Sequence, residues 1–332
     1  MTYKDFLTQC WKEHLLEKEN NAPTVISTFA GAGGSSLGYS MAGFRELLAV
    51  EIDNNAVETF KANFSDVPVF HGDIKKLSVE DVFNLTGIKK GELDIFDGSP
   101  PCQGFSTTGK RQLDDPRNYL FREYERLIKG IQPKVFVMEN VGGMVKGKMK
   151  IIFSEIFEAL ENCGYKVSVR LLNAKYFHVP QSRNRLIFLG VRNDLNTLPS
   201  HPKAKSKIIS VKEALKNLEN DKEKAWELKK GTKTYNIWSY TKPGCSMANF
   251  NSRLKIDPKL PSPTQVKSTP HFHWEEPRQM SSKEIARIGS FPDEFIFLGN
   301  REKINNRIGN SVPPLFMREI ALHIKKEILK YE

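Results

Sequence analysis

The sequence predicts an α/β protein, with a doubly wound, mostly parallel sheet in a large domain and a smaller, irregular second domain. Three observations predict this class. Short β-rich runs alternate with helix-compatible stretches through residues 24–192. A glycine-rich turn follows the first run, which is the layout of a nucleotide-type fold. Acidic residues and a cysteine directly follow later runs, at the strand ends where open α/β sheets bind ligands.

Composition narrows the class of protein and its partners. Of the 332 residues, 39% are hydrophobic and 27% are charged, as in a globular protein with room for two domains. The net charge of +11 indicates a polyanionic partner, nucleic acid first, although a merely basic protein would carry the same charge. The four cysteines form no CxxC pair, which argues against structural zinc and fits a reducing compartment. Without a signal-peptide layout or a membrane-length apolar run, we expect a cytoplasmic, nucleoid-associated protein.

Residues 1–23 predict a helical extension ahead of the sheet. Phe6, Leu7, Cys10 and Trp11 lie at helical spacing in an otherwise polar stretch. We expect this short amphipathic helix to dock on the main domain, and a partner-binding helix is the alternative.

The first three β-rich runs predict a pocket for an adenosine-containing ligand. The first, residues 24–29, leads into glycines that let the backbone approach a ligand, followed by a helix N-terminus with free N–H groups. Glu51 ends the second run about 20 residues after the glycine turn, where an acid suits a ribose diol. Asp73 follows the third run. Because the turn departs from G-x-G-x-x-G, the ligand need not carry a pyrophosphate.

The fourth run, residues 93–96, leads into a stiff turn that carries Cys102. Proline fixes its own φ and keeps the preceding residue out of the helical region, so two prolines before Cys102 extend the chain. A lone cysteine on such a turn is a candidate nucleophile, although most free cysteines are buried apolar residues. Residues 103–117 are polar, and we expect them to form a mobile lid with donors for phosphates.

The later runs add charged candidates. Glu139 ends a fifth run at residues 134–141, where an acid could also simply cap a helix. Arg183 and Arg185 enter the last predicted strand at alternate positions, so we expect both to point to the same side. Lysines interleaved with aromatic residues over residues 193–275 predict a small domain that contacts nucleic acid, with a disordered linker as the alternative.

Together these motifs resemble the DNA cytosine-5 methyltransferase family of the bacterial restriction-modification type. The matching motifs are Phe29-Ala30-Gly31-Ala32-Gly33-Gly34, Glu51, Gly72-Asp73-Ile74, Ser99-Pro100-Pro101-Cys102-Gln103-Gly104-Phe105-Ser106, Glu139-Asn140-Val141, Gln181-Ser182-Arg183-Asn184-Arg185 and Gly309-Asn310-Ser311-Val312. Their order and spacing are far more specific than any one of them. They cover residues 24–195 and 278–330, while the stretch between corresponds to the family's variable target-recognition region.

The resemblance implies a class I methyltransferase fold that binds S-adenosylmethionine and releases S-adenosylhomocysteine, with no metal. Residues 24–192 would form the catalytic and cofactor-binding domain, residues 193–275 the target-recognition domain, and residues 276–332 helices that complete the catalytic domain. The implied cofactor-binding residues are Phe29, Gly31, Gly33, Gly34, Glu51, Ile52, Asp73, Ile74, Pro101, Leu120, Asn310 and Val312. The implied catalytic residues are Cys102, Glu139, Arg183 and Arg185, and the DNA-binding residues are Gln103, Ser106, Thr108, Lys110 and Arg111. The implied partners are double-stranded DNA and a cognate restriction endonuclease, and we expect a monomer.

The chemistry explains why the family needs these residue types. Carbon 5 of cytosine becomes nucleophilic once a thiolate adds to carbon 6, which requires a cysteine near positive charge. A protonated Glu139 at N3 and an arginine at O2 would stabilise the charge that develops on the ring. The target base lies inside the duplex and has to be flipped out.

Four other functions fit the sequence less well. Methylation of an exocyclic amine needs no thiolate, so Cys102 disfavours it. A transfer-RNA cytosine-5 methyltransferase on the same scaffold usually has a shorter recognition region than the stretch of about 75 residues here. A catalytically inactive DNA-binding module would not need Cys102, Glu139 and the arginines together. A nicotinamide dehydrogenase is disfavoured by the glycine pattern and by the cysteine.

Overall fold

The computed structural model describes residues 1–101, 119–145, 149–205, 207–218, 226–247, 253–265, 267 and 270–331. Within these ranges the chain forms two compact units. The irregular unit consists of Met1–Leu16, Asn173–Arg183 and Ala204–Phe316, and the sheet unit of Glu17–Leu172, Asn184–Lys203 and Met317–Glu332. Each unit is described by itself below.

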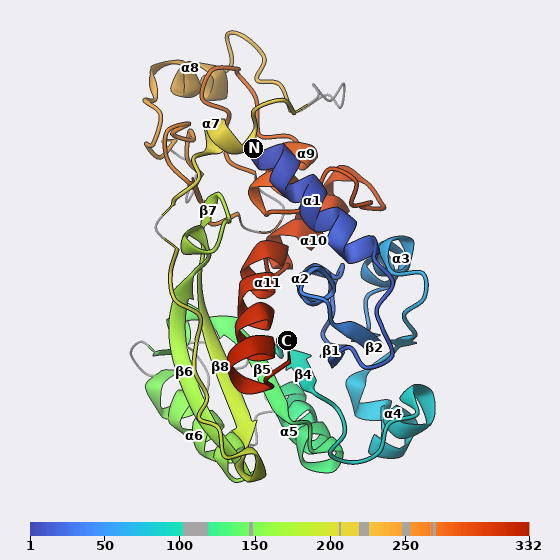
Figure 1. Ribbon diagram of the computed structural model, residues 1–332. Helices are drawn as coiled ribbons and strands as arrows, with labels where there is room; N and C mark the ends of the chain where they lie inside the picture. Colours follow the sequence, from blue (N-terminus) through green and yellow to red (C-terminus); the bar gives the residue numbers. More distant parts are fainter. Residues whose placement is uncertain are drawn as a thin grey trace. The chain divides into compact units, whose positions relative to one another are not determined.

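The sheet unit is a seven-stranded sheet with helices on both faces (Figure 1). Its strands are β1 (Thr24–Thr28), β2 (Arg45–Glu51), β3 (Val69–His71), β4 (Ile95–Gly98), β5 (Val135–Val141), β6 (Tyr165–Asn173) and β8 (Asn184–Arg192). Its helices are α2 (Gly34–Met41), α3 (Asn54–Asn63), α4 (Val79–Thr86), α5 (Tyr119–Ile131), α6 (Met149–Glu161) and most of α11 (Pro314–His323). This arrangement confirms the predicted fold class.

The strand order is β3-β2-β1-β4-β5-β8-β6, and it indicates at which edge of the sheet a ligand is expected to bind. The first five strands in this order pair in parallel, and β8 runs antiparallel to β5. The chain moves outward from β1 to β3 and then returns to the other side of β1 with β4. The carboxyl ends of β1 and β4 are therefore the topological switch point, where doubly wound sheets bind ligands.

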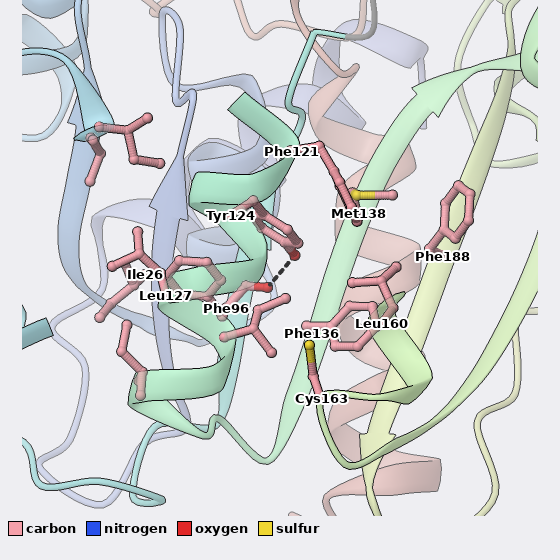
Figure 2. Close-up of a cluster of buried hydrophobic side chains, with 14 of the residues drawn as sticks. Ile26, Phe96, Phe121, Tyr124, Leu127, Phe136, Met138, Leu160, Cys163 and Phe188 are labelled. Carbon is pink, nitrogen blue, oxygen red and sulfur yellow. Dashed lines mark hydrogen bonds between the residues drawn. The ribbon is translucent and has the colours of Figure 1, made fainter. Parts of the chain in front are cut away.

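Large aromatic side chains from neighbouring strands form the core of the sheet unit (Figure 2). Phe96 on β4 lies opposite Phe136 on β5, and both are fully buried. The Tyr124 hydroxyl on α5 donates a hydrogen bond to the Phe96 carbonyl oxygen at 3.2 Å. This bond connects the helix to the sheet. Gly190 on β8 leaves the space for the Phe136 ring, since a Cβ there would lie 2.0 Å from it. The centre of the sheet is thus closely packed, which fixes the strand ends that carry the candidate residues.

The irregular unit is built from short helices and loops. Its helices are α1 (Tyr3–Leu15), α7 (Val211–Ala214), α8 (Lys233–Tyr240), α9 (Ser282–Ile288) and α10 (Arg301–Asn310), and the strands β7 (Gln181–Ser182) and β9 (Ser262–Pro263) pair in parallel. Trp238 on α8 packs with Phe272 in a small apolar cluster, so this region has a core of its own and is not a linker. No helix in the part of the chain that the structure describes has the length and apolarity to cross a bilayer.

The N-terminal helix exists as predicted, and its contacts are with residues 178 and 295, both within the ranges predicted for the catalytic domain. Helix α1 belongs to the irregular unit. The Tyr3 hydroxyl donates to the His178 carbonyl at 3.1 Å, and the Trp11 ring meets Phe295 edge-on. Apolar spacing identified the buried face of this helix, but not the surface that covers it.

The packing units and the predicted domains divide the chain differently. Residues 204–316 stay in the irregular unit, so no unit boundary falls at residue 275 or 276. The last segment, Met317–Glu332, does lie in the sheet unit, where the Tyr331 hydroxyl is 3.2 Å from Asp94 Oδ1. The predicted domain boundaries concern functional division and stay a prediction.

Candidate active site

The glycine-rich turn after β1 has a backbone that side chains rarely allow. Gly31 and Gly33 have φ values of +57° and +93°, in the left-handed region that glycine adopts readily. A Cβ on Gly33 would lie 2.5 Å from the ring of Phe64, whereas a Cβ on Gly31 would meet no atom within 4 Å. Gly33 is therefore required by packing. Gly31 leaves an open approach to the backbone, and Gly34 opens α2 directly after it.

Phe29 occupies the first position of this turn with an unusual conformation. Its φ is +55°, which is uncommon for a bulky residue and costs free energy. The side chain is half-buried and packs against the core of the sheet unit. Such strain is often found at ligand sites, which agrees with the predicted role of Phe29 beside a cofactor.

Glu51, at the end of β2, is hydrogen-bonded to the backbone of the glycine-rich turn. Its Oε2 accepts a hydrogen bond from the Gly31 N–H at 2.8 Å, and its Oε1 accepts from the N–H groups of Ile52 and Asp53, both at 2.8 Å. A carboxylate has about four acceptor positions, so three N–H donors leave capacity for a further hydroxyl. The structure thus brings Glu51 and the glycine turn together, as the sequence predicted, and shows that the acid also ties down the turn.

The next strand end carries Asp73 and Ile74 in different environments. The Asp73 carboxylate accepts from the Lys75 N–H at 3.0 Å and caps a short 3₁₀ turn, Ile74–Lys76. The Ile74 side chain is buried in the core. Arg126 on α5 donates through Nη2 to the carbonyls of Ile74 and Leu77 at 3.3 and 2.7 Å. Arg126 carries no sequence signal for this role, because a charged residue on an amphipathic helix resembles an ordinary solvated side chain.

The remaining predicted cofactor residues have less defined surroundings. Ile52 is 64% exposed, so its side chain is available to a ligand. Pro101 is exposed after β4, and Leu120 on α5 is half-buried against the core. Asn310 and Val312 belong to the irregular unit, Asn310 exposed at the end of α10 and Val312 buried.

Glu139 and Arg185 form an ion pair across β5 and β8. Arg185 Nε lies 2.5 Å from Glu139 Oε1, and both side chains are nearly buried, with 13% and 12% exposed. The register explains the pair: Glu139 lies opposite Ile187, so Arg185 is its diagonal neighbour on the same face. The guanidinium also donates through Nη1 to the Asn184 carbonyl at 2.8 Å. The predicted base-binding acid is therefore fixed by a predicted pocket arginine.

Arg183 lies in the irregular unit with partners of a different kind. Its side chain is 3% exposed, and its Nη1 and Nη2 donate to the carbonyls of Gln265 and Gly309 at 3.3 and 3.0 Å. Both bonds join segments that are far apart in the sequence. The strand pattern placed the two arginines on one side, but Arg183 falls between β7 and β8, where the strand alternation is interrupted.

Several predicted residues lie outside the described part of the chain. They are Cys102, Gln103, Ser106, Thr108, Lys110 and Arg111, together with the predicted lid at residues 103–117. The described chain does reach Pro101, the residue directly before Cys102. Within the described ranges, no group of three or more His, Cys, Asp or Glu side chains is placed to hold a metal ion.

A buried acid on β4 was also missed. Asp97 is 4% exposed, and its Oδ1 accepts a hydrogen bond from the Tyr39 hydroxyl at 3.1 Å. Burial raises the pKa of Asp97 to about 8. The two apolar residues before Asp97 in the strand indicate that it is buried. Its role was not predicted, because the prediction at this strand concerned Cys102 in the turn that follows.

Comparisons with known proteins agree with this geometry. The sequence profile of the C-5 cytosine-specific DNA methylases matches residues 23–326. The chain is 37% identical over 327 residues to the Type II methyltransferase M1.HphI of Haemophilus parahaemolyticus, covering 91% of this chain and 87% of that protein. It is 32% identical over 365 residues to the Type II methyltransferase M.XorII of Xanthomonas oryzae, covering 93% of this chain and 86% of that protein.

A solved structure extends the likeness to three dimensions. A DNA modification methyltransferase encoded within a prophage of Escherichia coli matches with a TM-score of 0.79 at 26% identity, covering 93% of this chain and 100% of that chain. The family profile alone spans most of the sequence. The chain therefore belongs to the C-5 cytosine-specific DNA methylases, and it is a DNA cytosine-5 methyltransferase of the bacterial restriction-modification type that uses S-adenosylmethionine.

Proposed function

We propose that this enzyme methylates a cytosine that is flipped out of a specific short duplex sequence, through a covalent bond between Cys102 and carbon 6 of the base. The observation that supports this most is the tie between Glu51 and the glycine turn at the switch point of the sheet. Strand β4, which leads into the Pro-Pro-Cys turn, lies directly beside β1, from which the glycine turn departs. Cofactor-binding residues and nucleophile thus follow neighbouring strands.

The cofactor half of the site fits an adenosine-type ligand. The open face of Gly31 lets a ligand approach the backbone, and the remaining acceptor capacity of Glu51 suits ribose hydroxyls. Phe29 would stack on the adenine, with Ile52 and Asp73 at its edge. S-adenosylmethionine supplies an electrophilic methyl group when bound. The other members of the proposed pocket are Gly33, Gly34, Ile74, Pro101, Leu120, Asn310 and Val312.

The base half of the site would act through Cys102 and Glu139. The Cys102 thiolate adds to carbon 6 of cytosine, and the electron pair that moves onto the ring makes carbon 5 nucleophilic. After carbon 5 takes the methyl group, the proton on carbon 5 leaves to a base or to water, and the thiolate is expelled. Glu139 would hold the N3/N4 edge of the base, with its own position fixed by Arg185. Arg183 would line the same pocket.

The DNA contacts would come from basic and polar side chains of this positively charged chain. The net charge of +11 favours a polyanion. Gln103, Ser106, Thr108, Lys110 and Arg111 would contact the DNA beside the flipped base, and the irregular unit would read the target sequence. We further propose a monomer that acts in the cytoplasm on nucleoid DNA and protects it from a cognate endonuclease.

A mechanism-based trap tests the covalent step. Duplex DNA with 5-fluorocytosine at the target position is expected to form an adduct that survives denaturation, because fluorine on carbon 5 cannot leave as a proton does. Cys102→Ser is expected to form no adduct and to lose methylation while still binding DNA. Cys245→Ser, at an exposed cysteine to which the proposal gives no role, is the matched control and should behave as the wild type.

The outcomes separate the proposal from its rivals. An active wild-type enzyme that forms no adduct in the presence of cofactor would contradict attack at carbon 6. Methylation of transfer RNA in preference to duplex DNA would contradict the proposed substrate. The target sequence itself would come from sequencing 5-methylcytosine in DNA from cells that express the enzyme.

A further inference from the structure

Asp97 is tied to its surroundings through both its backbone and its side chain. Its carbonyl oxygen accepts a hydrogen bond from Thr28 Oγ1 at 3.0 Å, which joins β4 to β1. Its Oδ1 accepts from the Tyr39 hydroxyl at 3.1 Å, which joins β4 to α2. Tyr39 is fully buried, so this hydrogen bond is shielded from water.

The two elements that this bond connects are those that flank the proposed site. Helix α2 begins at Gly34, directly after the glycine turn, and Tyr39 lies on its second turn. Strand β4 ends at Gly98, four residues before Cys102. Hydrogen bonds from Tyr39 and Ser35 to Asp97 therefore couple the helix behind the cofactor turn to the strand that precedes Cys102 in the sequence.

The end of β4 has little room to move. A Cβ on Gly98 would lie 2.4 Å from Thr28 Oγ1 and 2.6 Å from the ring of Tyr124. In such a closely packed environment, a shift of the Asp97 side chain is transmitted to the backbone instead of being absorbed by empty space. The next residues, Ser99 to Pro101, include two prolines that restrict the backbone.

The charge state of Asp97 follows from its neighbours. The titratable groups that face it are Tyr39 on α2, Glu46 on β2, Glu139 on β5 and Tyr124 on α5. Burial raises the pKa of Asp97 to about 8, and the negative charges of Glu46 and Glu139 act in the same direction against the hydrogen bonds from Tyr39 and Ser35. Asp97 is thus neutral at pH 7 and ionises as the pH rises through 8.

We propose that Asp97 is a positioning residue for methyl transfer: its carboxyl group, held by Tyr39 and Ser35, fixes the end of β4, the strand that precedes Cys102 in the sequence, relative to the helix behind the cofactor turn. This inference rests on the proposed role of Cys102. It assigns Asp97 no contact with substrate or cofactor. Ionisation of Asp97 places an uncompensated charge beside the strand end and disturbs this arrangement.

The experiment compares three variants with the wild type between pH 6 and pH 9.5. Tyr39→Phe removes the hydroxyl, and we expect kcat to fall by about tenfold while KM for S-adenosylmethionine changes little. Asp97→Asn can still accept from Tyr39 and stays neutral, so we expect near wild-type kcat at pH 7 and loss of the alkaline decline that the ionisation of Asp97 predicts for the wild type. Glu46→Gln removes the charge of another acid of this cluster, on β2, and this charge raises the pKa of Asp97; the decline should therefore persist in this variant but begin at a lower pH.

The readouts distinguish failure of this inference from failure of the proposed function. Wild-type kcat and an unchanged alkaline decline in both Tyr39→Phe and Asp97→Asn would overturn the positioning role, as would loss of the decline in Glu46→Gln. If both variants lose cofactor binding and unfold at lower temperature with no separate effect on kcat, the pair is merely structural and the inference is also overturned. Absence of the 5-fluorocytosine adduct in the wild type would instead overturn the proposed role of Cys102.

Discussion

Glu51→Gln tests whether the acid at the end of β2 organises the cofactor turn. Three backbone N–H groups point at the carboxylate: those of Ile52 and Asp53 at Oε1 and that of Gly31 at Oε2, each at 2.8 Å. The glutamine carbonyl can replace Oε1 and keep two of these hydrogen bonds. Its NH₂ group then faces the Gly31 N–H, and two donors cannot bond each other. The substitution therefore releases the glycine turn from β2.

The expected loss of free energy follows from the one hydrogen bond, to the Gly31 N–H, that Glu51→Gln removes. A hydrogen bond to a charged group contributes about 1.5–3 kcal/mol, and an unpaired N–H adds a desolvation cost when it is buried. The Gly31 N–H is partly buried, so we expect a loss of about 2 kcal/mol in the free energy of unfolding. If ordering the turn is required for binding, the same loss weakens S-adenosylmethionine binding by roughly thirtyfold.

Titration calorimetry with S-adenosylmethionine and thermal unfolding of the free enzyme measure the two quantities. Asp73→Asn is the matched control, because its Oδ1 accepts one backbone N–H, from Lys75, and the amide oxygen can keep that bond. We expect this control to unfold at the wild-type temperature. A Glu51→Gln enzyme with wild-type unfolding temperature and wild-type affinity would refute the reasoning.

Four further outcomes follow from the same structure. Gly33→Ala should lower the unfolding free energy by about 1–3 kcal/mol, because it combines a φ of +93° with a Cβ 2.5 Å from the Phe64 ring; thermal unfolding measures this. Arg126→Ala should raise KM for S-adenosylmethionine severalfold with little change in kcat, since it releases the turn after β3. Asp94→Asn should lower the unfolding temperature, because Lys134 Nζ loses its carboxylate partner at 2.8 Å. DNA binding measured by fluorescence anisotropy should weaken steeply with added salt.

Each of these outcomes has a control or a contrary result. Gly143→Ala should leave the unfolding temperature unchanged, because a Cβ there meets no atom within 4 Å. A change in kcat equal to the change in KM for Arg126→Ala would mean that the arginine acts beyond the turn after β3. Wild-type stability of Asp94→Asn would show that the neutral amide replaces the carboxylate fully. Salt-independent DNA affinity would contradict phosphate contacts by the basic surface.

The sequence predicted the strand ends well because local chemistry determines them. Glu51 ends a β-rich run, and glycines mark the turn after β1, where positive φ values require them. The same reasoning could not find Tyr39 as the partner of Asp97, because that bond joins residues 58 positions apart. Periodicity reports which face of an element is buried, but not what covers it.

Arg183 and Arg185 also show that a local sequence pattern does not identify the partners of a side chain. The sequence placed Arg183 and Arg185 together because strand alternation puts such residues on one side. Arg185 does meet Glu139, through a register that depends on β8 running antiparallel to β5. Arg183 instead bonds to carbonyls 82 and 126 positions away. Contacts of that length depend on the whole fold.

The placement of α1 has a consequence for how the protein is made. The helix leaves the ribosome well before its partners, since Trp11 packs against Phe295 and Thr8 bonds to Glu294, more than 280 positions later in the sequence. At a synthesis rate of about 5–20 residues per second, the apolar face of α1 waits roughly 15–60 s for these partners. The irregular unit is therefore completed late in synthesis, once the segment that carries Phe295 has emerged.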